Sequence, residues 1–401
     1  MHISIDIMLI GLVGKPSVGK STFFKAATLA EVEIAAYPFT TIKANHGVGY
    51  VKIDCIDKEF NTQCNPNHGF CINHKRFVPI ELMDVAGLVE GASEGKGLGN
   101  QFLDDLRQAD AFIHIVDASG MTDLEGKQIS DPSHNPCEDV EMLEKELNLW
   151  FYNIFMKVWK TFSRKTEMEH LKFSEAVAKQ FSGLRVTEDN VKDVLRKLKL
   201  PERPSLWKEE QVMEFASALR RASKPTIIAA NKCDFPSAKE NIKKLENAYP
   251  EFLIYPCSAD SELALRQAAK SGLIEYVPGE EDFKILKANE EQKSALEKIR
   301  KNVLEEYKGT GVQEILNLAV FDLLKYIAIF PAGANKLADS KGNVLPDCFL
   351  LPGGSTALDF AFYLHTDFGN NFIKAIDARS KQARGKEYVL KNRDAMEIVT
   401  K

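Results

Sequence analysis

The sequence predicts an α/β fold that is interrupted by an all-helical insertion and followed by a small α+β domain. Three observations predict this arrangement. A buried strand near the N-terminus leads directly into a glycine-rich loop and a helix. More than a hundred residues, rich in helical patterns, separate two later apolar strands, far more than an ordinary connection needs. The last 75 or so residues alternate short strands with one capped helix.

The composition is that of a folded, multidomain chain. A length of 401 residues predicts two to four domains, and 44% hydrophobic residues suffice for their cores. The net charge of −5 excludes a polycation. Any contact with nucleic acid is therefore expected from a local basic patch.

Cysteine usage and the N-terminal sequence both predict a cytoplasmic protein. The seven cysteines are odd in number and scattered, which favours reduced thiols. The first apolar run carries no preceding Lys or Arg and no cleavage site, so no signal peptide is expected. No window reaches about 18 consecutive apolar residues.

The first motif is a phosphate-binding P-loop between a strand at residues 7–13 and a helix at residues 23–29. Its glycines allow consecutive N–H groups to face an anion, and the helix N-terminus adds partial positive charge. Lys20 is expected to reach the outer phosphates, and Ser21 to bind Mg²⁺. The predicted nucleotide-binding residues here are Gly14, Lys15, Pro16, Ser17, Val18, Gly19, Lys20, Ser21 and Thr22.

A second motif predicts which base is bound. The apolar strand at residues 227–230 ends in Asn231, Lys232 and Asp234. A carboxylate at Asp234 can accept two hydrogen bonds from guanine that adenine cannot donate. Asn231 is expected to brace the loop, and the stem of Lys232 to cover the base.

The strand at residues 252–256 leads to Ser258 and Ala259, where a backbone N–H is expected to meet the guanine carbonyl oxygen. The bound cofactors are thus predicted to be GTP or GDP with Mg²⁺.

The sequence between these motifs predicts a nucleotide-sensing switch. A strand at residues 78–83 ends in Asp84, which is expected to hold Mg²⁺ through water, and the N–H of Gly87 is expected to contact the γ-phosphate. Upstream, either Thr40 or Thr41 could complete the Mg²⁺ shell. The glycine-rich residues 91–99 indicate a mobile switch segment or an ordinary flexible loop, followed by a helix at residues 101–108.

The domain boundaries follow from the change in pattern. After the strand Ala111–Asp117, Trp and Phe recur at helical spacing, which indicates the core of a helical subdomain rather than an exposed partner groove. His114 is expected to be a hydrogen-bonded core residue rather than a metal ligand. We predict four segments: 1–135 and 223–324 for the α/β domain, 136–222 for the insertion and 325–401 for the α+β domain.

The C-terminal segment predicts strands at residues 326–330, 347–351, 372–376, 387–390 and 396–399, and a helix at 357–364 capped by Ser355 and Thr356. Before it, helices are expected at residues 262–269 and 289–307. Seven basic residues of the last domain face only Asp377 and Glu387, and they form either an RNA-binding patch or a solvated basic face. They are Lys374, Arg379, Lys381, Arg384, Lys386, Lys391 and Arg393.

A cluster of thiols and imidazoles precedes Asp84. Cys64, His68, Cys71 and His74, together with Cys55, could bind Zn²⁺, but their spacings miss the usual Cys-x₂₋₄-Cys pattern. The interpretation that the spacing favours is a polar surface insertion.

The order of the motifs resembles the Obg-like translation-factor GTPases, most closely the YchF-type members that end in a TGS domain. The resemblance covers nearly the whole chain. It implies a Ras-type G domain with a helical insertion, a β-grasp TGS domain and a role around ribosomes or RNA. The motifs are Gly-Lys-Pro-Ser-Val-Gly-Lys-Ser-Thr at 14–22, Tyr-Pro-Phe-Thr-Thr at 37–41, Asp-Val-Ala-Gly-Leu-Val-x-Gly-Ala at 84–92, Gly-Leu-Gly-Asn-Gln-Phe-Leu at 97–103, Asn-Lys-Cys-Asp at 231–234 and Leu-Pro-Gly-Gly-Ser-Thr-Ala-Leu-Asp-Phe-Ala at 351–361.

The resemblance also assigns roles and marks departures. It favours Thr41 over Thr40, so Lys20, Thr41 and Gly87 are the predicted catalytic residues and Ser21, Thr41 and Asp84 the predicted Mg²⁺ ligands. Leu88 stands where Ras-type enzymes carry the water-positioning glutamine, which predicts slow hydrolysis. YchF-type proteins proper lose the guanine-reading Asp and can prefer ATP, whereas Asp234 is present here. Many members carry Asn, associated with potassium-assisted hydrolysis, where this chain has Ser17, so potassium dependence stays open.

The leading hypothesis is a cytoplasmic GTPase switch. One alternative is a ribosome- or RNA-binding adaptor whose nucleotide turnover is incidental. The other is an ATPase on the same P-loop.

Overall fold

A mixed seven-stranded sheet forms the centre of the computed structural model, which describes residues 8–29, 45–85, 87, 91, 106–334, 336–339 and 341–401. The strand order is β2-β4-β1-β5-β6-β7, with β3 paired to β4. β4, β1, β5, β6 and β7 run parallel, and β2 and β3 pair antiparallel with β4. The strands are β1 (Leu9–Val13), β2 (His46–Asp54), β3 (Phe70–Ile72), β4 (Lys75–Asp84), β5 (Ala111–Asp117), β6 (Thr226–Asn231) and β7 (Leu253–Pro256).

Both faces of this sheet are covered, because successive side chains of a strand point to opposite faces. Ile10 and Leu12 of β1 pack into a core with α1 (Lys20–Thr28) and α11 (Val312–Asn317). Leu9 and Val13 pack into a second core that continues into the helical insertion. The predicted α/β class is therefore confirmed, with β1, β5 and β6 buried along their whole length.

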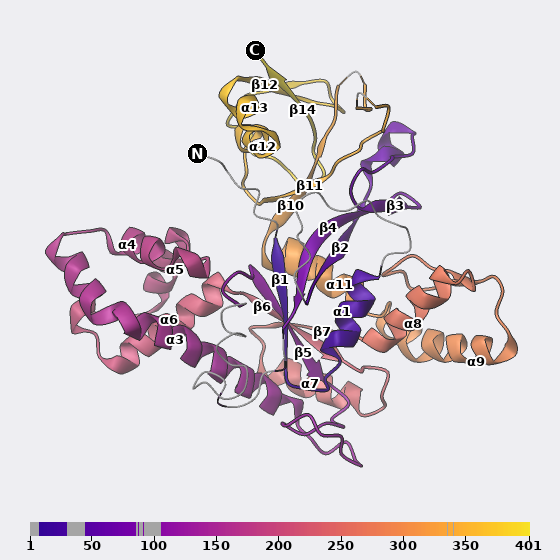
Figure 1. The fold of residues 1–401 in the computed structure, drawn as a ribbon, viewed down its shortest axis with the longest axis horizontal. Coiled ribbons are helices and arrows are strands. Elements are labelled where there is room, and N and C mark those ends of the chain that lie inside the picture. The colour runs from indigo at the N-terminus through magenta and orange to yellow at the C-terminus, as the bar shows by residue number, and fades with distance from the viewer. Residues whose placement is uncertain are drawn as a thin grey trace.

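The helical insertion projects from the sheet as a separate lobe, on the left in Figure 1. It comprises α3 (Pro136–Met168), α4 (Phe173–Gln180), α5 (Glu188–Lys197) and α6 (Glu209–Ser223). Thr187 caps α5 with a capping box, as its position before the apolar pattern indicates. Residues 101–105 of the helix predicted at 101–108 lie outside the described residues.

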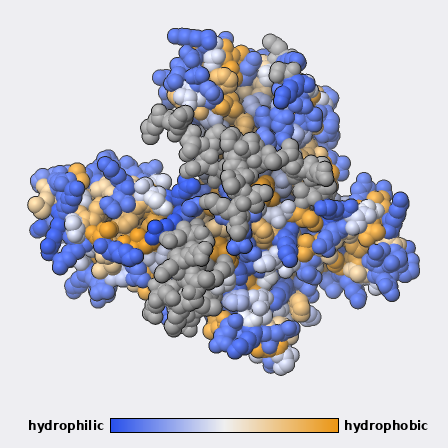
Figure 2. Space-filling model, viewed as in Figure 1, coloured by the Kyte–Doolittle hydropathy of each residue, from blue (hydrophilic) through white to orange (hydrophobic). Residues whose placement is uncertain are grey.

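The aromatic stripe forms the core of this lobe, as predicted. The rings of Phe155 and Phe181 stack with centroids 3.8 Å apart, and Trp159 packs against Trp207 and Phe215. Hydrophobic side chains also reach the surface of the lobe in Figure 2. The exposed large ones are Met156, Met168, Leu171 and Leu206.

Apart from β7, the segment between β6 and the last domain is helical, with one small hairpin of β8 (Ile274–Glu275) and β9 (Lys284–Ile285). The predicted helix at residues 289–307 is interrupted by a π-helical turn at Arg300–Leu304, and a second π turn, Leu318–Leu323, follows α11. The other helices are α7 (Ala238–Ala248), α8 (Ala259–Lys270), α9 (Glu290–Ile299) and α10 (Glu305–Tyr307).

The C-terminal domain is a five-stranded sheet of order β11-β10-β14-β12-β13 with a helix packed on it, at the top of Figure 1. Thr356 and Asp359 form the expected cap of α12. The elements are β10 (Tyr326–Pro331), β11 (Phe349–Pro352), α12 (Ala357–Leu364), α13 (Thr366–Asn370), β12 (Phe372–Asp377), β13 (Ala383–Arg384) and β14 (Ala395–Thr400).

The strand predicted at residues 387–390 is wrong. This segment hydrogen-bonds to the start of α12, where Ala357 N donates to Tyr388 O and Leu390 N donates to Ser355 O. The backbone of this segment thus bonds outside the sheet, and β12 pairs with β14 on one side and with β13 on the other.

No helix in the described part of the chain is long and apolar enough to cross a membrane.

We predict that Phe155→Ala destabilises the insertion by about 3–5 kcal/mol, because a fully buried ring is replaced by a cavity. Urea unfolding followed by tryptophan fluorescence measures this, since all three tryptophans of the chain, Trp150, Trp159 and Trp207, lie in this core. Met168→Ala is the matched control, because Met168 is 80% exposed and its loss should change stability by less than about 0.5 kcal/mol. Equal transitions for the two variants would contradict the assigned core.

Candidate nucleotide-binding site

The glycine-rich loop connects β1 to α1, and two of its glycines are required by close contacts. A Cβ atom on Gly14 (φ 148°) would lie 2.4 Å from Ile115 O. A Cβ atom on Gly19 (φ 97°) would lie 2.3 Å from Asn231 Nδ2. The loop therefore lies so close to β5 and to the end of β6 that neither glycine can be replaced by a residue with a side chain without a clash.

The two lysines of the loop have different surroundings. Lys20 begins α1, and its Nζ donates to Lys15 O at 2.9 Å across the loop. Burial lowers the pKa of Lys20, and the charge of Asp84 opposes this shift. The buried side chain of Lys15 instead lies 2.9 Å from Asp139 Oδ1 and donates to Thr122 O. Only the backbone of Lys15 remains to contribute to phosphate binding.

The predicted Mg²⁺ ligands on α1 and β4 lie together. Ser21 Oγ donates to Asp84 Oδ2 at 2.9 Å. Gly87 lies next to Pro16. A Cβ atom on Gly87 would lie 3.0 Å from the ring of Pro16. Thr40, Thr41 and Leu88 fall outside the described residues. The structure thus brings four of the predicted phosphate and metal positions to one edge of the sheet.

Asn231 joins this half of the site to the predicted base-binding half. Its buried side chain donates from Nδ2 to Val18 O (2.8 Å) and accepts at Oδ1 from Ala259 N (3.0 Å). The loop around Pro16–Gly19 and the N-terminus of α8 are therefore held to the end of β6.

Asp234 and Lys232 are each fixed by a neighbour. Ser258 Oγ donates to Asp234 Oδ1 at 2.8 Å, and Ser258 also caps α8. Lys232 Nζ lies 2.7 Å from Asp117 Oδ2. Sequence reasoning missed Asp117, although a carboxylate at the carboxyl end of a buried parallel strand is a recognisable signal.

His114 lies in β5 next to Val13 and is buried, as expected of a core residue. Burial and then the charges of Lys20 and Lys15 lower its pKa to about 3, so the ring is neutral near pH 7. The expected hydrogen bond is absent at one ring nitrogen, because Nε2 has no partner among the described residues.

Family models match three parts of the chain. They are described as "50S ribosome-binding GTPase" for residues 9–145, "Obg-like GTPase YGR210-like, G4 motif-containing domain" for 229–333 and "TGS domain" for 337–400. An uncharacterized GTP-binding protein, MJ1332 of Methanocaldococcus jannaschii, is 47% identical over 98% of this chain and 99% of its own. The chain belongs to the Obg-like GTPases.

Other members of the family support this assignment. The ribosome-binding ATPase YchF of Bacillus subtilis is 30% identical and covers 96% of the chain and 97% of its own length. The crystal structure of a GTP-binding protein from Pyrococcus horikoshii covers 98% of this chain and 100% of its own, with 41% identity and a TM-score of 0.78. The YchF GTPase of Schizosaccharomyces pombe, at 22% identity and a TM-score of 0.59 over 98% and 97%, shares the fold.

The basic residues of the TGS domain are partly used within the chain. Arg379 Nε lies 2.5 Å from Glu59 Oε2, and Arg393 pairs with the other oxygen of Glu59. Lys381 donates to a backbone carbonyl, and Arg384 lies over the ring of Tyr388. The remaining residues of the predicted patch, Lys374, Lys386 and Lys391, are exposed.

We predict that Asp139→Asn destabilises the G domain by about 3–5 kcal/mol, because the buried ammonium of Lys15 loses its counter-charge. The substitution should also weaken nucleotide binding, because Lys15 lies at the start of the P-loop. Urea unfolding by far-UV circular dichroism and a nucleotide titration test both effects. Glu138→Gln, at a neighbouring side chain that is 51% exposed, should change neither. If Asp139→Asn has the same free energy of unfolding as the wild type, the ion pair of Lys15 with Asp139 does not stabilise the loop.

Proposed function

We propose that this Obg-like GTPase binds GTP and GDP with Mg²⁺ and acts as a slow, nucleotide-controlled switch. The observation that carries the proposal is the joining of two motifs by Asn231. Its amide connects the P-loop at Val18 to the loop of Asp234 and to Ala259 at the start of α8. The residues that bind the phosphates and those that bind the base contact opposite ends of one nucleotide, so the distance between the two groups has to be fixed.

In this proposal each end of the site has a distinct task. The backbone N–H groups of residues 14–22 and the ammonium of Lys20 bind the phosphates. Asp234 accepts hydrogen bonds from guanine, the stem of Lys232 covers the base, and an N–H at Ser258 or Ala259 meets the guanine carbonyl. The salt bridge to Asp117 and the hydrogen bond from Ser258 restrict both side chains before the base arrives.

Ser21, Asp84 and Thr41 are the proposed residues around Mg²⁺. The donor set is all oxygen, which suits a hard cation, and the 2.9 Å contact of Ser21 with Asp84 brings two of these donors together. The ion, when bound, neutralises phosphate charge. Lys20 and the Gly87 N–H add stabilisation of the charge that develops during hydrolysis.

Hydrolysis by the protein alone is proposed to be slow. Leu88 follows Gly87 in the chain and cannot orient a water molecule, so a positioning group has to come from elsewhere. The names of relatives, a ribosome-binding ATPase and a 50S ribosome-binding GTPase model, suggest the ribosome as the partner. We therefore propose ribosome binding in the cytoplasm, which agrees with seven free cysteines.

Asp234→Asn is expected to weaken GTP binding by about 10- to 100-fold and to leave ATP binding unchanged, because the amide cannot accept both guanine hydrogen bonds. Competition of labelled GTP by GTP, GDP, ATP and ADP, with and without Mg²⁺, measures this. Asp260→Asn, an exposed carboxylate two residues beyond Ser258, is the matched control.

A preference of the wild-type protein for ATP would contradict the guanine assignment. It would favour the ATPase function that the YchF relatives carry in their names.

Ribosome cosedimentation should be stronger with a non-hydrolysable GTP analogue than with GDP, and phosphate release should rise when ribosomes are added. The physical reason is that the γ-phosphate orders the loops around Thr41 and Gly87. Lys20→Ala should abolish the difference between nucleotides. Binding that is salt-sensitive but equal with GTP and GDP would overturn the switch and favour an RNA-binding adaptor.

A further inference from the structure

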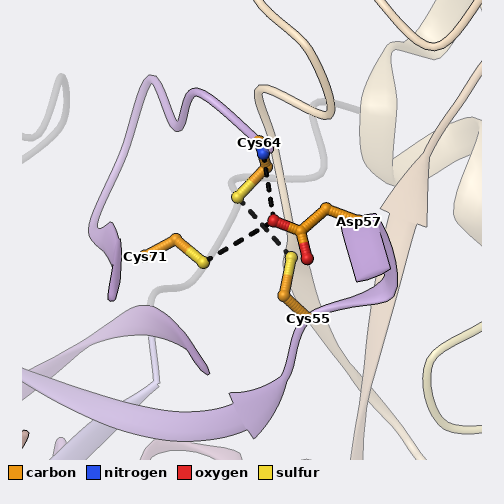
Figure 3. A group of neighbouring side chains, drawn as sticks. All are labelled: Cys55, Asp57, Cys64 and Cys71. Atoms are coloured by element: carbon orange, nitrogen blue, oxygen red, sulfur yellow. Dashed lines mark hydrogen bonds between the residues drawn. The ribbon is translucent and has the colours of Figure 1, made fainter. Parts of the chain in front are cut away.

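Three cysteines and a buried aspartate converge in the segment that connects β2 to β4. Cys55 follows β2, Asp57 lies in the 3₁₀ helix Ile56–Phe60, Cys64 lies in the next loop and Cys71 lies in β3. Their sulfur atoms and a carboxylate oxygen all lie within 4.8 Å of one another. Figure 3 shows the four side chains pointing toward a common centre.

The spacing of these atoms fits a tetrahedral metal site. Cys55 Sγ lies 3.5 Å from Cys64 Sγ, and Cys71 Sγ lies 3.9 Å from Asp57 Oδ2. Zinc–sulfur bonds of about 2.3 Å and zinc–oxygen bonds of about 2.0 Å give tetrahedron edges of about 3.5–3.8 Å. The longer of these edges, about 3.8 Å, joins two sulfurs, and the shorter, about 3.5 Å, joins a sulfur to an oxygen. The measured sulfur–sulfur separation of 3.5 Å and sulfur–oxygen separation of 3.9 Å each differ from these by less than about 0.5 Å, which side-chain rotation can supply.

The shell around the cluster also resembles that of a metal site. Asp57 is fully buried, and its Oδ1 lies 2.9 Å from Nδ1 of His74 while its Oδ2 accepts from Cys64 N. A histidine on the outer side of a ligating carboxylate orients it, as partners of metal ligands commonly do. Cys55 and Cys64 are buried, and Cys71 is half-buried, so these thiols do not fit the favoured interpretation of a polar surface insertion, whereas Asn61, Gln63, Asn65 and Asn67 around them are exposed.

A buried guanidinium lies beside the cluster and offsets part of the charge that a loaded site would carry. Arg76 is fully buried and pairs with Cys71 in the β3–β4 register, and its Nε has no hydrogen-bond partner in the described part of the chain. Three thiolates and a carboxylate around a divalent ion leave a net charge of about −2, which a neighbouring guanidinium partly compensates. Two thiols that simply form a disulfide would leave the third thiol and the buried Asp57 unexplained.

We propose that Cys55, Asp57, Cys64 and Cys71 bind one structural Zn²⁺ ion. The thiolate-rich, closed set of four ligands favours zinc over the oxygen-preferring Mg²⁺ of the nucleotide site. None of these four residues belongs to the predicted nucleotide site, so this proposal does not depend on the proposed function.

The ion holds the surface on which the TGS domain rests. Within the same segment, Asn65 N donates to Val344 O at 2.8 Å and Asn67 N donates to Pro346 O at 2.9 Å. Glu59, two residues beyond Asp57, binds both Arg379 and Arg393. Cys55, Ile56 and Cys64 share one apolar core with Leu345 and Cys348. Metal binding therefore stabilises the contact between the G domain and the TGS domain.

Metal content of the purified full-length chain, with any histidine tag removed, tests the site. Elemental analysis should find about one zinc per chain in the wild type and nearly none in Cys64→Ser. Cys137→Ser is the matched control, because this cysteine lies at the start of α3, outside the cluster, and should retain the ion. His74→Ala should weaken zinc binding by about 10- to 100-fold, since it removes only the orienting contact.

Cobalt substitution gives a readout that needs no variant. Demetallated, reduced wild-type protein titrated with Co²⁺ should develop the intense visible bands of tetrahedral thiolate coordination at one equivalent. Limited proteolysis between the two domains should become faster after chelation and slow again when zinc is restored.

Three results would overturn the proposal. The first is a metal-free wild type that gives no tetrahedral Co²⁺ spectrum. The second is full zinc retention in Cys64→Ser. The third is a Cys55–Cys64 disulfide found by mass spectrometry in protein that was purified under reducing conditions.

Discussion

The buried amide of Asn231 is the contact on which the candidate nucleotide site depends. Its two polar ends connect the P-loop and the start of α8 to the last residue of β6. Both bonds are buried, so breaking either one leaves an unpaired polar group without access to water. The close approach of Gly19 to the same amide adds a steric constraint. A single side chain thereby sets the separation between the residues proposed to bind phosphates and those proposed to bind the base.

The helical insertion contacts the candidate nucleotide site directly. Asp139, in the first turn of α3, forms the buried ion pair with Lys15, and the segment before α3 packs Gly126 against Pro16. A movement of α3 relative to the sheet would therefore disturb the first residues of the P-loop. This connection gives binding events on the insertion a physical route to the nucleotide site.

Sequence patterns predicted the parts of the molecule in which neighbours along the chain determine the structure. The strand–loop–helix around Lys20, the buried strands β5 and β6, and the cap at Thr356 all belong to this class. Contacts between distant residues were not predictable in the same way. The ion pair of Lys15 with Asp139 joins residues more than a hundred positions apart, and β2 was missed because glycines obscure its alternation.

The thiol cluster shows the same limit. Its spacing along the chain argued against a metal site, because the usual patterns assume that ligands come from tight turns. The structure brings Cys55, Cys64 and Cys71 together from the end of a strand, a loop and a short edge strand. The spacing along the chain therefore could not reveal that these side chains converge in space.

The pairing of β5 with β6 has a consequence for how the chain reaches its native state. These neighbouring central strands are separated by more than a hundred residues, so their association closes a long loop. The entropy of closing a loop grows with its length, and non-local strand pairing slows folding. If α3 and α6, which pack against each other, form first, the two ends of the insertion are brought together and the effective loop becomes short. Formation of the insertion's aromatic core would then precede, and accelerate, completion of the sheet.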